Sequence, residues 1–435
     1  MGSERGPCVH GGLKLAVIGA GWAGLAAAVR AVEAGHRVTL LEMAGQAGGR
    51  ARGVAIEGLA LDNGQHILIG AYVRTLALMR TVGADIESTL WRSPLELRYP
   101  DGRGLRMPAG PAWLGFGLAV ARCRGWSWLD RLMLLSRAAR WAAAGFRCEP
   151  RLSVDALCKG LPKTVRELLI DPLCVAALNT PAPQASAQVL LRVLRDALFG
   201  GRGTADLLLP RRPLDELLPR PALAWLRQAG TDVRLSTRVL GLQADAGQGW
   251  RIDGEAFDAV VLACTAAESA RLVQDISPDW AAQAQGLRYE PIVTVYLRCP
   301  GARLPSPMTA LVDGPEAPAQ FAFDHGALGA TPGLFAFVVS GAAPWVERGL
   351  QATADAVLRQ AHDAFASGTW PQPPTLLRAM AEKRATFRCT PALLRPGAVI
   401  APGLVAAGDH VAGPYPATLE GAVRAGEAAV ALLDG

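Results

Sequence analysis

The sequence predicts an α/β protein built on a Rossmann-like dinucleotide-binding domain, with an α+β domain inserted into it. Three observations support this fold class. A glycine-rich strand–helix–strand unit occupies 13–42, and 404–432 combine a strand, a Gly-Asp pair and an alanine-rich helix. Alternating β-branched residues at 287–298, together with strands expected at 308–313 and 334–340, indicate a second sheet. With 435 residues the chain is long enough for two or three domains.

The first unit, residues 13–42, reads LKLAVIGAGWAGLAAAVRAVEAGHRVTLLE. The apolar run 13–18 predicts a buried parallel strand, and the alanine-rich stretch after it predicts a helix that ends near Ala34. A second strand, RVTLL, ends at Glu42. In a βαβ unit of this kind an acid at that position accepts hydrogen bonds from ribose hydroxyls.

Between the first strand and the helix, Gly19, Gly21 and Gly24 complete the pattern G-x-G-x-x-G. The first glycine allows a tight turn, the second lets backbone approach a pyrophosphate, and the third lets helix and strand pack closely. The helix N-terminus then offers free N–H groups to the phosphates. An ordinary glycine-rich turn would not require Glu42, so the unit predicts a dinucleotide site.

The next stretch, AGQAGGRARG at 44–53, resembles the GG-R signature of the flavin amine oxidase and carotenoid desaturase superfamily. In that superfamily the loop passes over the FAD pyrophosphate. The resemblance therefore implies FAD as the cofactor, an FAD-binding domain of the GR2 type, and contacts from Gly49 and Arg50. Glycines permit close approach, and an arginine neutralises phosphate charge.

Residues 404–432 resemble the C-terminal flavin motif of the same superfamily. The resemblance implies that Asp409 binds the ribityl chain. It also implies that the start of the final helix faces the pyrimidine end of the flavin, at Thr418, Leu419 and Glu420. Because 400–435 contains no cysteine, we expect the FAD to be held non-covalently.

Two stretches between these ends, 232–242 and 256–273, look like the strands that complete the FAD-binding domain. They would place Val239 beside the adenine and Ala263 near the phosphates. The FAD-binding domain would then be discontinuous, formed by 1–85, 205–270 and 390–435. The insertions would form the substrate-binding domain and its helical cap, at 86–204 and 271–389.

Polar residues interrupt an otherwise apolar, strand-like stretch, LDNGQHILIG, at 61–70. Polar side chains in such a run need a partner or a function. Asp62 and Gly64 match the D-x-G element that passes the reactive edge of the flavin in the superfamily. The motif DNGQHILIGAY follows GGRARG, and a second motif, GDHVAGPYPATLEGAV, lies near the C-terminus. Both resemble motifs of the hydroxysqualene dehydroxylases, the squalene-associated FAD enzymes of bacteria.

That resemblance implies replacement of the hydroxyl of hydroxysqualene by hydrogen, which yields squalene for hopanoid synthesis. An acid should protonate the leaving hydroxyl, and His66 is the first candidate, with Asp62 assisting it. Tyr72 and Tyr415 are expected to line the substrate cavity, where aromatic faces stabilise a cation. Both catalytic candidates also have a structural interpretation, and Asp324–His325 is a second acidic pair worth testing.

Other functions stay open at this point. A phytoene-type carotenoid desaturase or a flavin amine oxidase would share the fold, although only Tyr415 offers the aromatic that amine oxidases place in pairs beside the flavin. A non-catalytic prenyl-lipid carrier of the Rab GDP-dissociation-inhibitor type also shares the architecture. The intact glycine pattern, Glu42 and Arg50 argue against a carrier. The sequence does not identify the electron donor.

Composition excludes several classes of protein. The eight cysteines are scattered without a CxxC pair, which indicates a reduced, cytoplasmic protein and argues against a zinc site or a disulfide framework. The net charge is +6, but no nucleic-acid-binding motif accompanies it. We therefore expect no metal and no nucleic-acid partner. No run reaches the roughly 18 apolar residues of a transmembrane helix.

Residues 107–142 contain four tryptophans and five arginines against one acid. Tryptophan and arginine beside apolar runs are typical of a membrane interface, which would place the protein peripherally on the inner face of the cytoplasmic membrane. On a helical projection, however, Arg131, Arg137 and Arg140 do not share one face. The alternative is a buried helical cap that lines an apolar substrate cavity, and both interpretations stay open.

Overall fold

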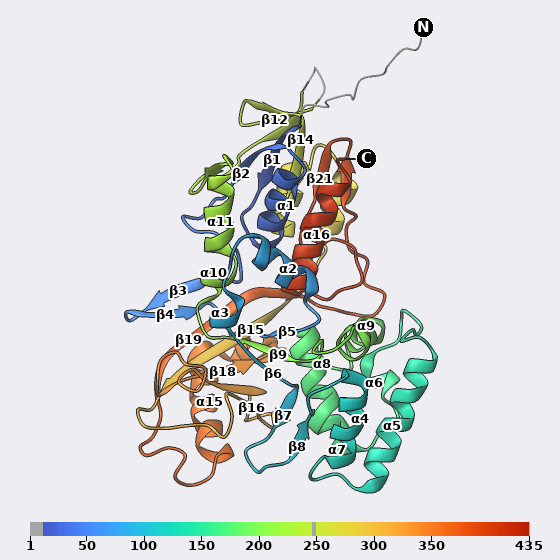
Figure 1. Cartoon of the computed structure of the whole chain (residues 1–435), viewed down its shortest axis with the longest axis vertical. Coiled ribbons are helices and arrows are strands. Elements are labelled where there is room, and N and C mark those ends of the chain that lie inside the picture. Colours follow the sequence, from blue (N-terminus) through green and yellow to red (C-terminus); the bar gives the residue numbers. More distant parts are fainter. Residues whose placement is uncertain (1–11, 246–248, 435) are drawn as a thin grey trace.

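The computed structural model describes residues 12–245 and 249–434. A six-stranded sheet with the order β10-β2-β1-β14-β21-β20 lies at one end of the elongated molecule, and a second sheet with a helical region lies at the other (Figure 1). All neighbours in the first sheet are parallel except β20. Its strands are β10 (Asp232–Arg234), β2 (Arg37–Leu41), β1 (Lys14–Ile18), β14 (Ala259–Leu262), β21 (Leu404–Ala406) and β20 (Val399–Ala401).

Helices and a small sheet cover the two faces of this parallel sheet. On one face α1 (Trp22–Glu33) packs against α16 (Leu419–Ala431) and α11 (Pro219–Gln228) around one apolar core. A Cβ on Gly426 of α16 would overlap the carbonyl oxygen of Ala23, so these helices touch through backbone. The other face carries β11 (Leu242–Ala244), β12 (Trp250–Ile252), β13 (Glu255–Phe257), α12 (Ala266–Val273) and α13 (Pro278–Gln285).

This part of the molecule confirms the predicted Rossmann-like α/β fold. The strand, helix and strand expected in 13–42 are β1, α1 and β2, and the final helix is preceded by Thr418 as its N-cap. The strand expected over 232–242 is shorter than predicted. The chain leaves the sheet after Arg234 because Ser236 has φ 53° and the amides of Ser236 and Thr237 bond to the carbonyls of Ala44 and Glu42.

The second sheet has five strands in the order β16-β17-β18-β15-β19. Three of them were expected, and β17 and β19 were not. The charged residues in the middle of β19, TLLRAMAEKRATF, hide its strand character. One face packs on α14 (Ala343–Arg348) and α15 (Leu350–Ala364). The strands are β15 (Tyr289–Arg298), β16 (Met308–Ala310), β17 (Phe321–Asp324), β18 (Leu334–Val339) and β19 (Thr375–Phe387).

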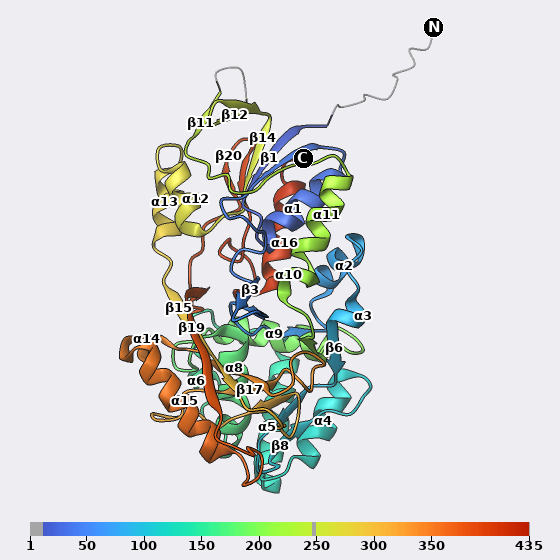
Figure 2. The same ribbon diagram turned by 90° about the vertical axis from the view of Figure 1, so that its left-hand side faces the viewer.

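The other face of the second sheet shares a core with a helical region, which lies in the half of the molecule that does not contain α1 and α16 (Figures 1 and 2). Within the described residues no helix is long and apolar enough to cross a bilayer. The helices are α4 (Ala112–Arg122), α5 (Trp128–Ala143), α6 (Val154–Leu157), α7 (Lys163–Val165), a π-helical turn (Arg166–Ile170), α8 (Asp171–Leu178) and α9 (Ala187–Phe199).

Short elements connect the two halves. β5, β9 and β6 form one small sheet, and β3–β4 and β7–β8 are hairpins. The strands are β3 (Gly53–Ile56), β4 (Leu59–Asp62), β5 (Leu68–Ile69), β6 (Leu90–Ser93), β7 (Glu96–Arg98), β8 (Gly104–Arg106) and β9 (Leu207–Pro210). The helices are α2 (Val73–Thr81), α3 (Ile86–Thr89) and α10 (Leu214–Leu217).

Candidate active site

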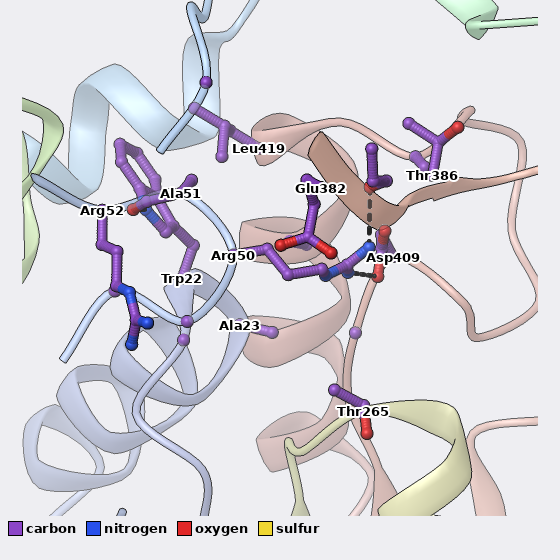
Figure 3. A pocket seen from close by; sticks show the side chains of 18 of the residues that line it. Trp22, Ala23, Arg50, Ala51, Arg52, Thr265, Glu382, Thr386, Asp409 and Leu419 are labelled. Carbon is purple, nitrogen blue, oxygen red and sulfur yellow. Dashed lines mark hydrogen bonds and ion pairs between the residues drawn. The ribbon is translucent and has the colours of Figure 1, made fainter. Parts of the chain in front are cut away.

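A cavity of about 650 Å³ runs from the carboxyl edge of the parallel sheet to the second sheet. Figure 3 shows it from close by. At the parallel-sheet end it is lined by predicted cofactor residues: Gly19, Gly21, Glu42, Gly49, Arg50, Gly64, Val239, Ala263, Asp409, Thr418 and Leu419. At the other end most side chains are apolar: Val175, Ala176, Ala177, Ile292, Phe321, Phe323 and Val338.

The glycines of the first loop have the local geometry of a tight turn and of close helix packing. Gly19 has φ 108°, and a Cβ there would lie 2.7 Å from the carbonyl oxygen of Ala263. A Cβ on Gly24 would overlap the carbonyl oxygen of Gly19, so α1 packs directly on the turn. Around Gly21, by contrast, the nearest described atom is the Cα of Gly49, 3.9 Å from a Cβ position. The backbone at Gly21 is therefore open to a ligand.

The second glycine pair crosses the N-terminus of α1. Gly48 and Gly49 have φ 113° and 61°, which glycine adopts without strain. The Gly48 amide donates to the carbonyl oxygen of Ala20 over 2.9 Å. No side chain caps α1, so the amides of its first turn stay available for a phosphate.

Glu42 is held at the end of β2 by two backbone amides. Its Oε2 accepts from the Ala20 amide over 2.7 Å, and its Oε1 accepts from the Ala44 amide over 2.8 Å. Each carboxylate oxygen can accept a second hydrogen bond. The carboxylate is thus oriented by its neighbours and keeps acceptor capacity for ribose hydroxyls.

The lining of the cavity also contains an ion-pair network that the sequence did not indicate. Arg238 and Arg271 both donate to Glu268, over 2.8 and 2.7 Å, and all three residues line the cavity. Arg271 also donates to the carbonyl oxygen of Val239 over 2.7 Å. Only the i, i+3 spacing of Glu268 and Arg271 was visible in the sequence, and Arg238 joins them through the fold.

Arg50 connects three parts of the chain (Figure 3). Its Nη2 lies 2.6 Å from Oδ1 of Asp409, and its Nη1 donates to the carbonyl oxygen of Ala385 in β19 over 2.9 Å. Burial alone would raise the pKa of Asp409, but the charges of Arg50, His410 and Arg395, together with the hydrogen bond from Arg50, outweigh burial and lower it. The GG-R loop, the C-terminal motif and the second sheet therefore meet at one ion pair.

Three polar atoms on residues that line the cavity have no hydrogen-bond partner among the described residues: Arg52 Nε, Gln65 Oε1 and His410 Nε2. Buried polar atoms of this kind normally bind a ligand or water. Together with the open backbone at Gly21 they fit a polar, phosphate-bearing cofactor. The site therefore suits FAD.

The residues predicted at the start of α16 do not all face the cavity. Thr418 caps the helix, because its Oγ1 accepts from the Gly421 amide over 3.1 Å. Leu419 and Tyr72 line the cavity, and burial raises the pKa of the Tyr72 phenol. Glu420 is buried, but its carboxylate accepts from the amide and hydroxyl of Thr75 over 2.9 and 2.8 Å. The structure does not bring the Glu420 side chain to the cavity.

The two catalytic candidates, His66 and Asp62, have different surroundings in the structure. His66 lines the cavity, and its Nδ1 lies 2.8 Å from the carbonyl oxygen of Gly64, so Nδ1 carries the proton and Nε2 is an acceptor. Burial lowers the pKa of His66. Asp62 is buried and not among the lining residues, and its Oδ1 accepts from the Leu214 amide at the start of α10 over 2.8 Å. In this structure Asp62 anchors the loop.

The pKa of Asp62 leads to a stability prediction. Burial raises it from 3.8 to about 7. Below pH 3.8 the Asp62 carboxyl is protonated in both the folded and the unfolded chain. Between pH 3.8 and about 7 it ionises only in the unfolded chain. The free energy of unfolding therefore falls as pH rises, by roughly 4 kcal/mol in total. Asp62→Asn should therefore raise the thermal unfolding midpoint, more at pH 8 than at pH 5. Equal gains at both values would contradict this.

Two further sequence candidates lie outside the cavity lining. The Tyr415 hydroxyl donates to Asp196 over 3.0 Å and accepts from Arg192 over 2.8 Å, so this ring belongs to an ion-pair cluster on α9. Asp324 is buried and accepts from the amides of Leu304 and Ala327 over 3.1 and 2.9 Å, which is a structural role. Burial lowers the pKa of His325 to about 4.

Other polar residues of the cavity were missed by sequence reasoning. Among them are Asn179, Ser340, Glu382 and Thr386. Asn179 ends α8 with φ 47°, and its amide nitrogen donates to Thr386 over 3.0 Å. Glu382, which belongs to β19, lies beside Arg50 (Figure 3). Since β19 was not predicted, no sequence signal could have placed Glu382 and Thr386 at the cavity.

Comparison with known proteins agrees with this site. The model for "Flavin containing amine oxidoreductase" matches residues 22–433. A hydroxysqualene dehydroxylase from Sinorhizobium fredii is 30% identical over 96% of this chain and 97% of the relative, and one from Rhodopseudomonas palustris is 29% identical over the same shares. A probable zeta-carotene desaturase from Synechococcus elongatus is 25% identical over 66% of each chain.

A crystal structure of an oxidoreductase from Methanosarcina mazei has the same fold. It is 16% identical, covers 97% of this chain and 100% of its own, and has a TM-score of 0.73. The glycine loops, Glu42 and the Arg50–Asp409 pair thus occur in a chain that matches the family model over almost its whole length. The chain belongs to the flavin containing amine oxidoreductase family and is an FAD-dependent oxidoreductase.

Proposed function

We propose that the protein is a hydroxysqualene dehydroxylase, which replaces the hydroxyl of hydroxysqualene by hydrogen and releases squalene and water. The observation that carries this proposal is the continuity of one cavity from the FAD groove into an apolar end lined by Phe321, Phe323 and Ile292. An isoprenoid chain has no polar group except the hydroxyl, and it suits such walls. The dehydroxylases that resemble this chain along almost its whole length support the same substrate.

The reaction consumes a proton and a hydride for each hydroxyl lost. Reduced FAD supplies the hydride when it is bound, so an external electron donor must reduce it in every turnover. The residues of the cavity have two tasks, which are to exclude water and to protonate the hydroxyl as the carbon–oxygen bond breaks. The apolar wall performs the first task.

We assign the second task to His66, which lines the cavity and can present Nε2 to a substrate. Delivery of a proton requires the imidazolium form. Because burial lowers the pKa of His66 below 6.5, that form becomes more abundant only as pH falls. We therefore expect the rate of dehydroxylation to rise from pH 8 toward pH 6, measured in single turnovers with reduced enzyme. A flat profile over this range would contradict the assignment.

His66→Ala should lower the rate of the chemical step by roughly 100- to 10,000-fold and leave the flavin spectrum unchanged. The matched control is Glu382→Gln, because Glu382 is another titratable side chain that lines the cavity. If Glu382→Gln loses the activity and His66→Ala keeps it, the proton comes from Glu382. Asp62→Asn should keep the activity, since that carboxylate bonds to the Leu214 amide.

The function itself is tested under anaerobic conditions. Purified holoprotein is reduced chemically, hydroxysqualene is added, and the visible flavin band is followed while the lipids are extracted. Return of the oxidised band together with squalene supports the proposal. A band that stays reduced over unchanged substrate would contradict it. Oxidised enzyme that instead introduces double bonds into a polyene would identify a carotenoid desaturase, the function of a relative that matches two thirds of the chain.

A further inference from the structure

Two neighbouring helices, α4 and α5, expose an unusual number of apolar side chains. Of the fifteen large hydrophobic residues that are exposed in the described chain, six lie between positions 113 and 132. We call them the α4–α5 surface: Trp113, Leu114, Leu118, Trp128, Leu129 and Leu132. Trp113 is 57% and Trp128 73% exposed. Both helices lie at the end of the molecule opposite α1 and α16 (Figures 1 and 2).

The exposed residues share a face on each helix. Leu114 and Leu118 are four positions apart on α4, and Trp128 and Leu132 are four apart on α5, so each pair lies one turn above the other. The opposite faces enter the core through Ala119 and Trp141 among others. No described residue of 107–142 lines the cavity, so the interpretation of this segment as a cavity wall is wrong. Substrate binding does not explain these side chains.

The charges around this surface are basic and unpaired. Arg122, Arg124 and Arg140 are exposed, and no acid of the described residues lies within 4.0 Å of them. Arg131 and Arg137 differ, because they donate to the carbonyl oxygens of Cys123 and Leu157 over 2.8 and 2.7 Å. Arg131 and Arg137, two of the three arginines that do not share one face, are therefore structural, and the exposed arginines border the apolar face.

The one acid of the segment is also accounted for. Asp130 forms a capping box with Ser127 at the start of α5, with bonds of 2.9 and 3.1 Å. Its charge therefore serves the helix N-terminus. An apolar face with exposed tryptophans, bordered by free arginines, remains.

We propose that the α4–α5 surface docks on an anionic phospholipid bilayer. Tryptophan and leucine enter the interface between headgroups and acyl chains, and the arginines bind lipid phosphates. A second copy of the chain fits less well, because a two-fold contact would bring Arg122 and Arg124 of both copies together. The surface is separate from the cavity, so docking does not depend on which lipid the enzyme converts.

The first test uses purified holoprotein and flotation with vesicles of phosphatidylcholine, alone or mixed with phosphatidylglycerol. The protein should bind the mixed vesicles and dissociate as salt rises. Trp113→Ser with Trp128→Ser should weaken binding at least about tenfold and leave the flavin spectrum unchanged. The matched control is Leu394→Ser with Val399→Ser, two exposed apolar residues outside the surface, which should bind normally.

The second test changes charge. Arg122→Gln with Arg124→Gln should weaken binding to the mixed vesicles about thirtyfold, and Arg37→Gln with Arg227→Gln, exposed arginines elsewhere, should not. Equal binding by all variants, or none by the wild type, would overturn the proposal. A dimer in size-exclusion chromatography that the tryptophan substitutions dissociate would overturn it in favour of a second copy. Dehydroxylation of detergent-dispersed substrate should persist in every variant.

Discussion

Gly24→Ala should yield a protein without FAD, or no folded protein at all. A Cβ at this position would overlap the carbonyl oxygen of Gly19, which is backbone and has no rotamer to change. To remove this overlap, α1 would have to move away from β1. That movement would disrupt the apolar core that α1 shares with α16. The measurement is the ratio of flavin absorbance to protein absorbance after purification, with the thermal unfolding midpoint.

Gly117→Ala is the matched control for Gly24→Ala. Gly117 also lies inside a helix, but a Cβ there meets no atom of the described residues within 4 Å. Alanine is the better helix former by about 1 kcal/mol, so this variant should be at least as stable as the wild type. Normal flavin content in Gly24→Ala would show that α1 can move, and it would contradict the assignment of Gly24 to close packing.

Arg50→Met should destabilise the protein and weaken flavin binding together. The substitution removes the partner of Asp409, whose side chain is 10% exposed, and leaves a buried carboxylate without its cation. Loss of one partner of a buried pair costs roughly 3–5 kcal/mol, and the lower end applies because Arg50 is one third exposed. Thermal unfolding and FAD titration of the apoprotein measure the two effects.

A double-mutant cycle separates the ion pair from other effects of Arg50. Asp409→Asn removes the buried charge, so Arg50→Met with Asp409→Asn should be more stable than Arg50→Met alone. The hydrogen bond from Arg50 to the carbonyl oxygen of Ala385 is lost in both variants and cancels in this comparison. Strictly additive effects of the two substitutions would mean that the pair contributes no interaction energy.

Local chemistry explains why the dinucleotide-binding unit could be predicted. In 13–42 the strand, the turn at Gly19, the helix and the second strand follow one another within 30 residues, and each is specified by its own residues. The same holds for α16, where the side chain of Thr418 caps the helix that begins one residue later. In such segments the pattern of apolar residues and glycines predicts the local backbone conformation directly.

The side-chain directions at the site were harder to predict. Asp62, Glu420 and Tyr415 lie in motifs that were correctly located along the chain, yet their polar groups bond to Leu214, Thr75 and Asp196. A motif fixes where the backbone passes. Which way a side chain turns depends on partners from other segments, and the sequence around the motif does not contain them.

The sequence by itself therefore determined the cofactor class, the parallel sheet and the two glycine loops that line the cavity. Only the tertiary structure decided what faces the substrate. β19 brings Glu382 and Thr386 to the cavity, and the Arg50–Asp409 ion pair joins residues 359 positions apart. The physical reason is that backbone conformation responds to neighbours within a few residues, whereas burial and ion pairing depend on contacts that exist only after distant segments have packed together.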